Sequence, residues 1–227
     1  GTAFTRISDS AAWIAAALKA AGVRRAVLVG HSMGTLIAME TALLLRGDDA
    51  VTRGGGLCGD PGLVGTVSGY LPDPVEGCGV ERAVRLESVH GVRLSQPATL
   101  TCPTARTPGQ WVDQSARPEV GRMGGGLSGL RVAAHYACRT RNHQPGARIS
   151  EHGKGKAIDI AALQLRDGSE ISVLDDWGQG PRGRVLRRVH RDACGPFGTV
   201  LGPESDRFHR DHFHFDTARH RGGPYCR

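Results

Sequence analysis

Six cysteines lie at wide intervals along the chain, and they limit how it can fold more than any other feature of the sequence. An even number of cysteines without a Cys-x-x-Cys pair favours three disulfides over a thiolate zinc site or a thioredoxin-like motif. Six reduced, buried thiols in a cytosolic protein are the alternative. We therefore expect a cross-linked fold in an oxidising compartment, periplasmic or extracellular. The sequence does not choose among the possible pairings of Cys58, Cys78, Cys102, Cys138, Cys194 and Cys226.

The charge balance narrows the class of partner. The 227 residues carry a formal net charge of +7, which favours polyanions such as nucleic acid, anionic lipid or an acidic cell-wall polymer. Only 5% of the residues are aromatic and the basic residues are scattered, so a stacking platform for nucleic acid is not indicated. No apolar run reaches the roughly 18 residues of a transmembrane helix, and no signal peptide is visible. We expect peptidoglycan or another anionic cell-wall polymer as the partner, and no nucleic acid.

The chain changes character near residue 50. The pattern of residues 1–50 predicts a helix–strand–helix segment, and residues 51–56 resemble a linker. The elements expected in this segment are a helix from Asp9 or Ser10 to Ala21, a strand over Ala26–Val29 and a helix over Thr35–Arg46.

Residues 57–227 predict an α+β domain, a small antiparallel sheet with flanking helices that holds a zinc site. Glycine, proline and cysteine are frequent here, and the elements are short. The expected strands are Val84–Val89, Gly91–Leu94, Leu130–Ala134, Lys156–Leu165, Ile171–Val173 and His212–Asp216. The expected helices are one within Pro97–Val112, which carries Trp111, and a basic amphipathic helix over Arg182–Ala193.

One motif in the first segment has a catalytic precedent. Residues 27–34 are Val-Leu-Val-Gly-His-Ser-Met-Gly, in which G-x-S-x-G follows an expected strand and precedes an expected helix. This resembles the nucleophile elbow of the α/β-hydrolases, with Ser32 as the nucleophile. The parallel strands, acid and histidine of such an enzyme do not follow, and a serine without its base is a weak nucleophile. We therefore expect a hydrolase-like fragment that docks loosely and in which Ser32 is silent.

Two histidine-containing motifs carry the strongest chemistry. In H-R-D-H-F-H-F-D, strand periodicity places His212, His214 and Asp216 on one face and Phe213 and Phe215 on the other. The phenylalanines can then be buried while the histidines point into a cleft. Surface or core histidines are the ordinary alternative for either one taken alone.

The other motif is S-E-H-G-K-G-K-A-I-D, which ends at Asp159. Asp159 is expected on a strand whose same-face neighbours, Ala157 and Ala161, leave room for a metal. The glycine-bearing loop can fold His152 back beside Asp159. Two histidines and one carboxylate form a catalytic zinc set with an open fourth position for water.

A longer series of motifs extends over residues 57–227. It consists of Leu57-Cys58-Gly59-Asp60-Pro61, Gly77-Cys78-Gly79, Leu94-Ser95-Gln96-Pro97, His135-Tyr136-Ala137-Cys138-Arg139, S-E-H-G-x-G-x-A-I-D, Gly198 to Pro203, H-R-D-H-F-H-F-D and Tyr225-Cys226-Arg227. This series closely resembles the bacterial extensin-like C-terminal domain. That domain is in turn similar to the zinc peptidases that cut D-Ala-containing peptidoglycan peptides, whose hallmarks are H-x6-D and a later H-x-H.

The resemblance implies a set of roles for these residues. It implies zinc at His152, Asp159 and His214, with His212 beside the water of the zinc. It also implies that Arg139 contacts substrate, for which a structural ion pair is the alternative. The implied function is zinc-dependent hydrolysis of cell-wall peptides, of D-Ala-D-Ala carboxypeptidase or endopeptidase type.

The proton-transfer group is less closely defined. Many relatives have a glutamate three residues before the last ligand, where this chain has Asp211. We expect His212 to carry the proton to the leaving amine, with His209 or Asp211 as alternatives. Glu151 and Asp216 are expected to orient the histidines. Two other functions stay open: a wall-binding module that keeps the zinc fold without turnover, and a serine hydrolase that uses the elbow serine.

Overall fold

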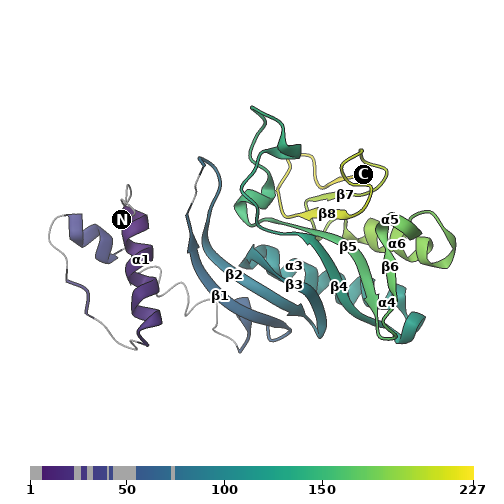
Figure 1. The fold of residues 1–227 in the computed structure, drawn as a ribbon, viewed down its shortest axis with the longest axis horizontal. Coiled ribbons are helices and arrows are strands. Elements are labelled where there is room, and N and C mark those ends of the chain that lie inside the picture. The colour runs from purple at the N-terminus through teal and green to yellow at the C-terminus, as the bar shows by residue number, and fades with distance from the viewer. Residues whose placement is uncertain (1–6, 23–26, 30–32, 40, 43–54, 73–74) are drawn as a thin grey trace.

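The computed structural model describes residues 7–22, 27–29, 33–39, 41–42, 55–72 and 75–227. The described residues form one nine-stranded sheet, in the order β1-β2-β3-β4-β5-β8-β7-β9, with β6 also paired to β5 (Figure 1). Its strands are β1 (Leu63–Leu71), β2 (Val80–Val89), β3 (Val92–Thr101), β4 (Leu127–Ala134), β5 (Ala157–Leu165), β6 (Glu170–Ser172), β7 (Thr199–Leu201), β8 (Phe213–Asp216) and β9 (Tyr225–Cys226).

The fold class is α+β as expected, but the sheet is larger than expected and it is mixed. β3 and β4 are parallel, as are β7 and β9, whereas the other pairs are antiparallel. The sequence pattern missed β1, because Gly65 and Gly69 lie at irregularities of its ladder and interrupt the alternation. Pro97 lies in β3 rather than in a helix. It falls between the paired positions Arg93 and Ala98, at an irregularity where the missing N–H breaks no ladder bond.

Helices cover one face of this sheet. They are α3 (Cys102–Trp111), α4 (Arg117–Val120) and α6 (Gly180–Ala193). The short helix α5 (Val173–Asp176) contacts β6 and α6, and α1 (Ile7–Ala20) belongs to the first segment. α3 begins where Thr101 Oγ1 accepts a hydrogen bond from Thr104 N, at 3.4 Å. Val173, expected on a strand, begins α5 instead, because the Ser172 side chain accepts from Asp175 N and caps the turn.

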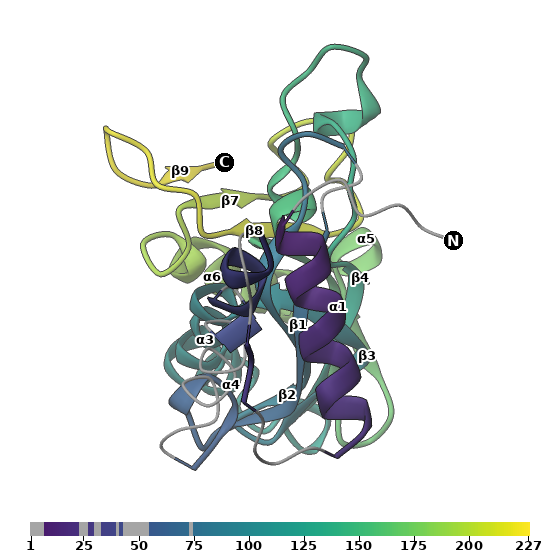
Figure 2. The ribbon, with the colours of Figure 1, turned by 90° about the vertical axis from the view of Figure 1, so that its left-hand side faces the viewer.

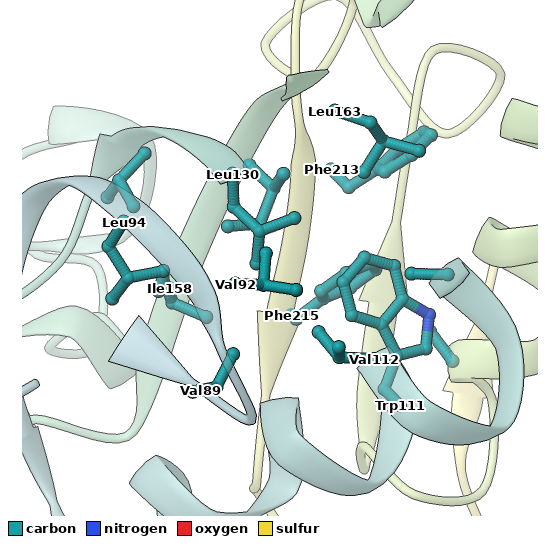
Figure 3. Packing of buried hydrophobic residues seen from close by; sticks show 14 of the residues in the cluster. Val89, Val92, Leu94, Trp111, Val112, Leu130, Ile158, Leu163, Phe213 and Phe215 are labelled. Carbon is teal, nitrogen blue, oxygen red and sulfur yellow. The ribbon is translucent and has the colours of Figure 1, made fainter. Parts of the chain in front are cut away.

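The core lies between α3, α6 and the central strands. Figure 2 shows α3, α4 and α6 on the same side of the sheet. Trp111 Nε1 donates a hydrogen bond to the carbonyl of Val189 in α6 at 2.8 Å, and the Trp111 ring lies 5.2 Å from the Phe215 ring (Figure 3). Phe213 and Phe215 are 0% and 1% exposed, as the alternation in β8 predicts. Their burial against the helices fixes the orientation of β8, so that His214 points to the other face.

Three disulfides cross-link the domain, which confirms the expectation from the cysteine count. They join Cys58 to Cys102, Cys78 to Cys138, and Cys194 to Cys226, and no cysteine is free. The first ties the turn before β1 to the start of α3. The second ties the turn before β2 to the segment after β4, and the third ties the end of α6 to β9.

α1 lies beside β1, the edge strand of the sheet (Figures 1 and 2). α1 begins at Ile7, so that Asp9 lies in its first turn rather than at its cap, and Tyr70 in β1 donates a hydrogen bond to Asp9 Oδ1 at 3.3 Å. Ala11 and Ala15 are buried. In the described part of the chain, no helix is long and apolar enough to cross a bilayer.

The elbow strand is not formed where it can be checked. Residues 27–29 have no regular secondary structure, and Val27 and Val29 are each 90% exposed. A buried strand of this composition needs neighbouring strands, and no strand of the described residues pairs with it. Residues 33–39 are helical, in agreement with the helix expected there. Ser32, the possible nucleophile, lies outside the described residues.

Candidate metal centre

The pairing of β5 with β8 brings the two motifs together. The ladder is antiparallel, and Asp159 is directly opposite His214. Side chains of directly paired residues lie on the same face, so both point away from the helices. Asp159 and His214 are 4% and 8% exposed.

The loop between Ser150 and Gly155 supplies His152. This loop forms the short helix η5 (Glu151–Lys154), which is capped by the Ser150 side chain and ends at Gly155 with φ 64°. Thr101 N donates a hydrogen bond to the Gly155 carbonyl at 2.8 Å, which ties the loop to the end of β3. His152 is thereby turned back toward β5 and is 1% exposed.

These three side chains meet at one point. His152 Nε2 lies 3.1 Å from Asp159 Oδ1 and 3.1 Å from His214 Nδ1, and His214 Nδ1 lies 2.9 Å from Asp159 Oδ1. One ligand atom from each residue lies within 4.8 Å of the other two, in a group that could hold a metal ion. The convergence predicted from the two motifs is therefore present.

The outer nitrogens of both histidines are held by acceptors. His152 Nδ1 lies 2.7 Å from the carbonyl oxygen of His135, and His214 Nε2 lies 3.2 Å from Asp216 Oδ2. A carbonyl and a carboxylate can only accept, so these nitrogens carry protons. When each ring is in its neutral form, its lone pair, at Nε2 of His152 or Nδ1 of His214, is directed toward the common point.

Electrostatics within the cluster favour a charged pair in the metal-free protein. Burial raises the pKa of Asp159, but hydrogen bonds and charges from His152 and His214 outweigh it and hold the pKa well below its ordinary value. Burial lowers the pKa of His214, but Asp159 and Asp216 outweigh it and raise the pKa to about 9. A cation bound to the three residues would replace the proton of His214.

Two further histidines lie at the rim of the cluster. His212 precedes β8 and its side chain is 16% exposed, with Nε2 3.5 Å from Asp159 Oδ2 and Nδ1 2.7 Å from Asp211 Oδ1. The His209 ring lies 5.7 Å from that of His214. Burial lowers the pKa of His209, and the opposing effect of Asp206, 2.8 Å from Nδ1, only partly offsets this. Both rings therefore lie beside the cluster.

The remaining candidates are distributed around this centre. Asp216 lies beside His214, where it was expected. The carboxylate of Glu151 accepts from Lys154 Nζ at 2.7 Å and lies 3.7 Å from Arg141, and among the described residues no histidine contacts it. Arg139 is half-buried, its carbonyl accepts from Ser150 N at 2.9 Å, and within the described ranges no carboxylate pairs with its guanidinium.

Sequence reasoning missed two groups of this site. The His135 carbonyl orients His152, but a backbone acceptor has no signature in a sequence. Asp206 holds His209, and the i, i+3 spacing of the pair was the available signal.

A comparison with protein families finds a match over most of the chain. The family model of the extensin-like protein C-terminus matches residues 69–227. This chain belongs to the extensin-like C-terminal family. The match begins later than residue 57, where the sequence resemblance was placed. No curated protein and no solved structure showed a significant match.

The extensin-like domain braces its candidate centre with a disulfide. A Cβ at Gly153 would lie 3.1 Å from Cys78 Sγ and 2.9 Å from a methyl group of Ile149. Gly79 N donates to the Gly153 carbonyl at 2.9 Å. The Cys78–Cys138 disulfide thus packs directly against the residue that follows His152, and only glycine fits there without displacement.

Proposed function

We propose that this extensin-like domain is a zinc-dependent peptidase that acts on cell-wall peptides, of D-Ala-D-Ala carboxypeptidase or endopeptidase type. The observation that carries the proposal is the convergence of His152, Asp159 and His214 from two separate motifs on one buried point. Catalytic zinc sites use such a set of three nitrogen and oxygen ligands and keep a fourth position open.

The donors fit zinc in chemistry as well as in number. Two imidazole nitrogens and a carboxylate are ligands that zinc accepts, whereas calcium and magnesium require oxygen ligands. The outer nitrogens of both rings are bound to the His135 carbonyl and Asp216, an arrangement that fixes ring orientation in zinc sites. Zinc held there would act as a Lewis acid, polarising a peptide carbonyl and lowering the pKa of water.

The residues at the rim would move the proton. His212 lies at the edge of the cluster, partly exposed, and Asp211 holds its Nδ1. Its Nε2 lies 3.5 Å from Asp159 Oδ2, at the edge of the cluster, and would deliver a proton to the leaving amine. His209 is a second candidate carrier, because its ring lies beside that of His214 and burial, which lowers its pKa, favours the neutral ring. Arg139, which no carboxylate of the described residues neutralises, would bind the carboxylate end of a peptide.

Two properties of the chain, its positive net charge and its disulfides, support the cell wall as the substrate. A net charge of +7 favours an anionic polymer. Three disulfides favour an oxidising compartment, so we infer a periplasmic or extracellular location. Peptidoglycan has both properties: it carries free carboxylates and lies outside the cytoplasm.

The test is hydrolysis of purified peptidoglycan by the full chain, followed as release of amino groups. We expect activity that a chelator removes and that added zinc restores. The His212→Ala chain should be inactive with zinc bound, whereas a His143→Asn chain, changed at an exposed histidine outside the cluster, should keep full activity. Zinc binding without any hydrolysis would reject the peptidase and favour the wall-binding alternative.

A further inference from the structure

A basic hollow lies at one end of the sheet, apart from the candidate metal centre. Its volume is about 1150 Å³, and the three cluster side chains are not among the residues that line it. Its walls are the start of β2, the end of β3 with the first turns of α3, and the segments that precede β5 and follow β8. A hollow of this size exceeds the roughly 300–1,000 Å³ of small-molecule pockets, so it suits a segment of a polymer.

The lining of this basic hollow is strongly unbalanced in charge. A single acidic side chain, Glu81, stands against five basic ones. The basic residues are Arg82, Arg106, Lys154, Lys156 and Arg219.

Three of these cations have neither a carboxylate partner nor a side-chain hydrogen bond among the described residues. Lys154 pairs with Glu151, and Arg106 donates from Nε to the carbonyl of Cys58 at 2.8 Å, which satisfies the guanidinium without neutralising it. Arg82, Lys156 and Arg219 are exposed, and no carboxylate in the described part of the chain pairs with them. Unpaired cations gathered in a concave surface concentrate a positive potential and attract anions.

The floor of the basic hollow is rigid. The Cys58–Cys102 disulfide lies in its wall. Thr217 N donates to the Lys156 carbonyl at 3.0 Å, and the hydroxyls of Thr104 and Thr217 are 2.8 Å apart. The backbone that carries Lys156 is therefore held in place, which lowers the entropy lost when a ligand is bound.

We propose that this hollow binds an anionic carboxylate-bearing polymer of the cell wall through Arg82, Lys156 and Arg219. No aromatic residue lines it, which argues against nucleic acid, because single strands are held by base stacking. Lys154 and Lys156 lie on the loop between His152 and Asp159, so a polymer held here stays next to the candidate centre. The choice of a wall carboxylate polymer among polyanions rests on the proposed function, whereas the anion site itself does not.

The experiment compares two triple variants of the full chain in a pelleting assay with purified peptidoglycan at low salt. One variant is Arg82→Gln/Lys156→Gln/Arg219→Gln. The control, Arg122→Gln/Arg166→Gln/Arg184→Gln, removes the same charge from exposed positions outside the hollow. We expect the first variant to bind about tenfold more weakly, as the loss of three partly exposed charge contacts implies, and the control to bind as the unchanged chain does. Thermal unfolding of both variants verifies that they are folded.

Three results would overturn the proposal: equal weakening in both variants, no weakening in either, or stronger competition by an oligonucleotide than by poly-L-glutamate of equal charge. Failure of the proposed function is seen separately. If the chain hydrolyses nothing but the two variants differ as expected, the anion site stands. If hydrolysis occurs and the variants bind alike, the site alone is rejected.

Discussion

The two regions of the chain treat their large apolar side chains differently. In residues 57–227, Trp111 and Phe215 are each 1% exposed and lie against each other between α3 and β8. In the described part of the first segment, Met33 and Met39 are 65% and 61% exposed, and Val27 and Val29 more so. Apolar composition alone therefore does not produce a core; the second region has a sheet for its side chains to pack on.

The regions also differ in how they are held. Three disulfides and a continuous sheet fix the second region, and one of the disulfides packs against the His152 loop. Among its described residues, the first segment has two small buried alanines in α1 and is joined to the sheet by the Asp9–Tyr70 hydrogen bond. Stability and the candidate chemistry should both depend on the second region.

The largest effect is expected from the ligands themselves. His214→Ala removes one of three ligands and should weaken zinc binding by more than about 100-fold, beyond what loss of an orienting residue causes. His212→Ala should keep zinc and lower turnover by about 10²–10⁴, the usual contribution of a proton-transfer group. Zinc content and hydrolysis are measured on the same samples. Equal zinc loss in both variants would show that the roles are wrongly assigned.

The disulfide beside His152 should matter for both stability and metal. Breaking it with Cys78→Ala/Cys138→Ala opens a link across 60 residues, and breaking another of the three disulfides with Cys194→Ala/Cys226→Ala opens one across 32. Loop-closure entropy predicts a loss of about 4 kcal/mol in the free energy of unfolding for each. Only the first should also weaken zinc binding, because only it packs against Gly153. The same zinc affinity in both variants would contradict this bracing role.

Gly153 offers a smaller perturbation of the same contact. Gly153→Ala inserts a methyl group against Cys78 Sγ and Ile149, which should cost about 1–3 kcal/mol of unfolding free energy through overpacking. Gly222→Ala is the matched control, since a Cβ there meets nothing within 4 Å. Urea unfolding compares the two. A stable Gly153→Ala chain with normal zinc affinity would mean that the loop can shift freely.

The smallest effect is expected from the first segment. A chain that begins at Leu57 loses the Asp9–Tyr70 hydrogen bond, and its unfolding free energy should change by less than about 1.5 kcal/mol, the net worth of one such bond. Zinc binding should be unchanged, and a fluorophosphonate should not label Ser32 in the full chain. If the shortened chain does not fold, or if Ser32 is labelled, the two regions are not independent and the serine-hydrolase hypothesis gains support.

Much of the centre could be predicted because its signals are local. The alternation in H-R-D-H-F-H-F-D predicted which side chains of β8 face the helices, and the glycine-bearing loop after His152 predicted that it folds back beside Asp159 on the next strand. The pairing of Asp159 with His214 was beyond the sequence, since register depends on which strands meet.

The sequence predictions that failed concern features whose signal in the sequence is weak or not local. β1 was missed because its glycines break the period-2 pattern. The strand expected over His212–Asp216 is one residue shorter, since β8 begins at Phe213. The disulfide partners lie 32 to 60 residues apart, so only the folded topology selects them. Glu151 was expected to orient a histidine, but Lys154 lies nearer in η5.

The central claim is that His152, Asp159 and His214 form a metal centre, and a zinc titration of the full chain against a competing chelator tests it most directly. We expect a single saturable site whose affinity rises with pH, about tenfold per unit as one proton is displaced. The rise should end near the pKa of His214, about 9 in the metal-free protein, because above it no proton remains to be displaced. Absence of saturable binding, or equal binding by the His214→Ala chain, would contradict the claim.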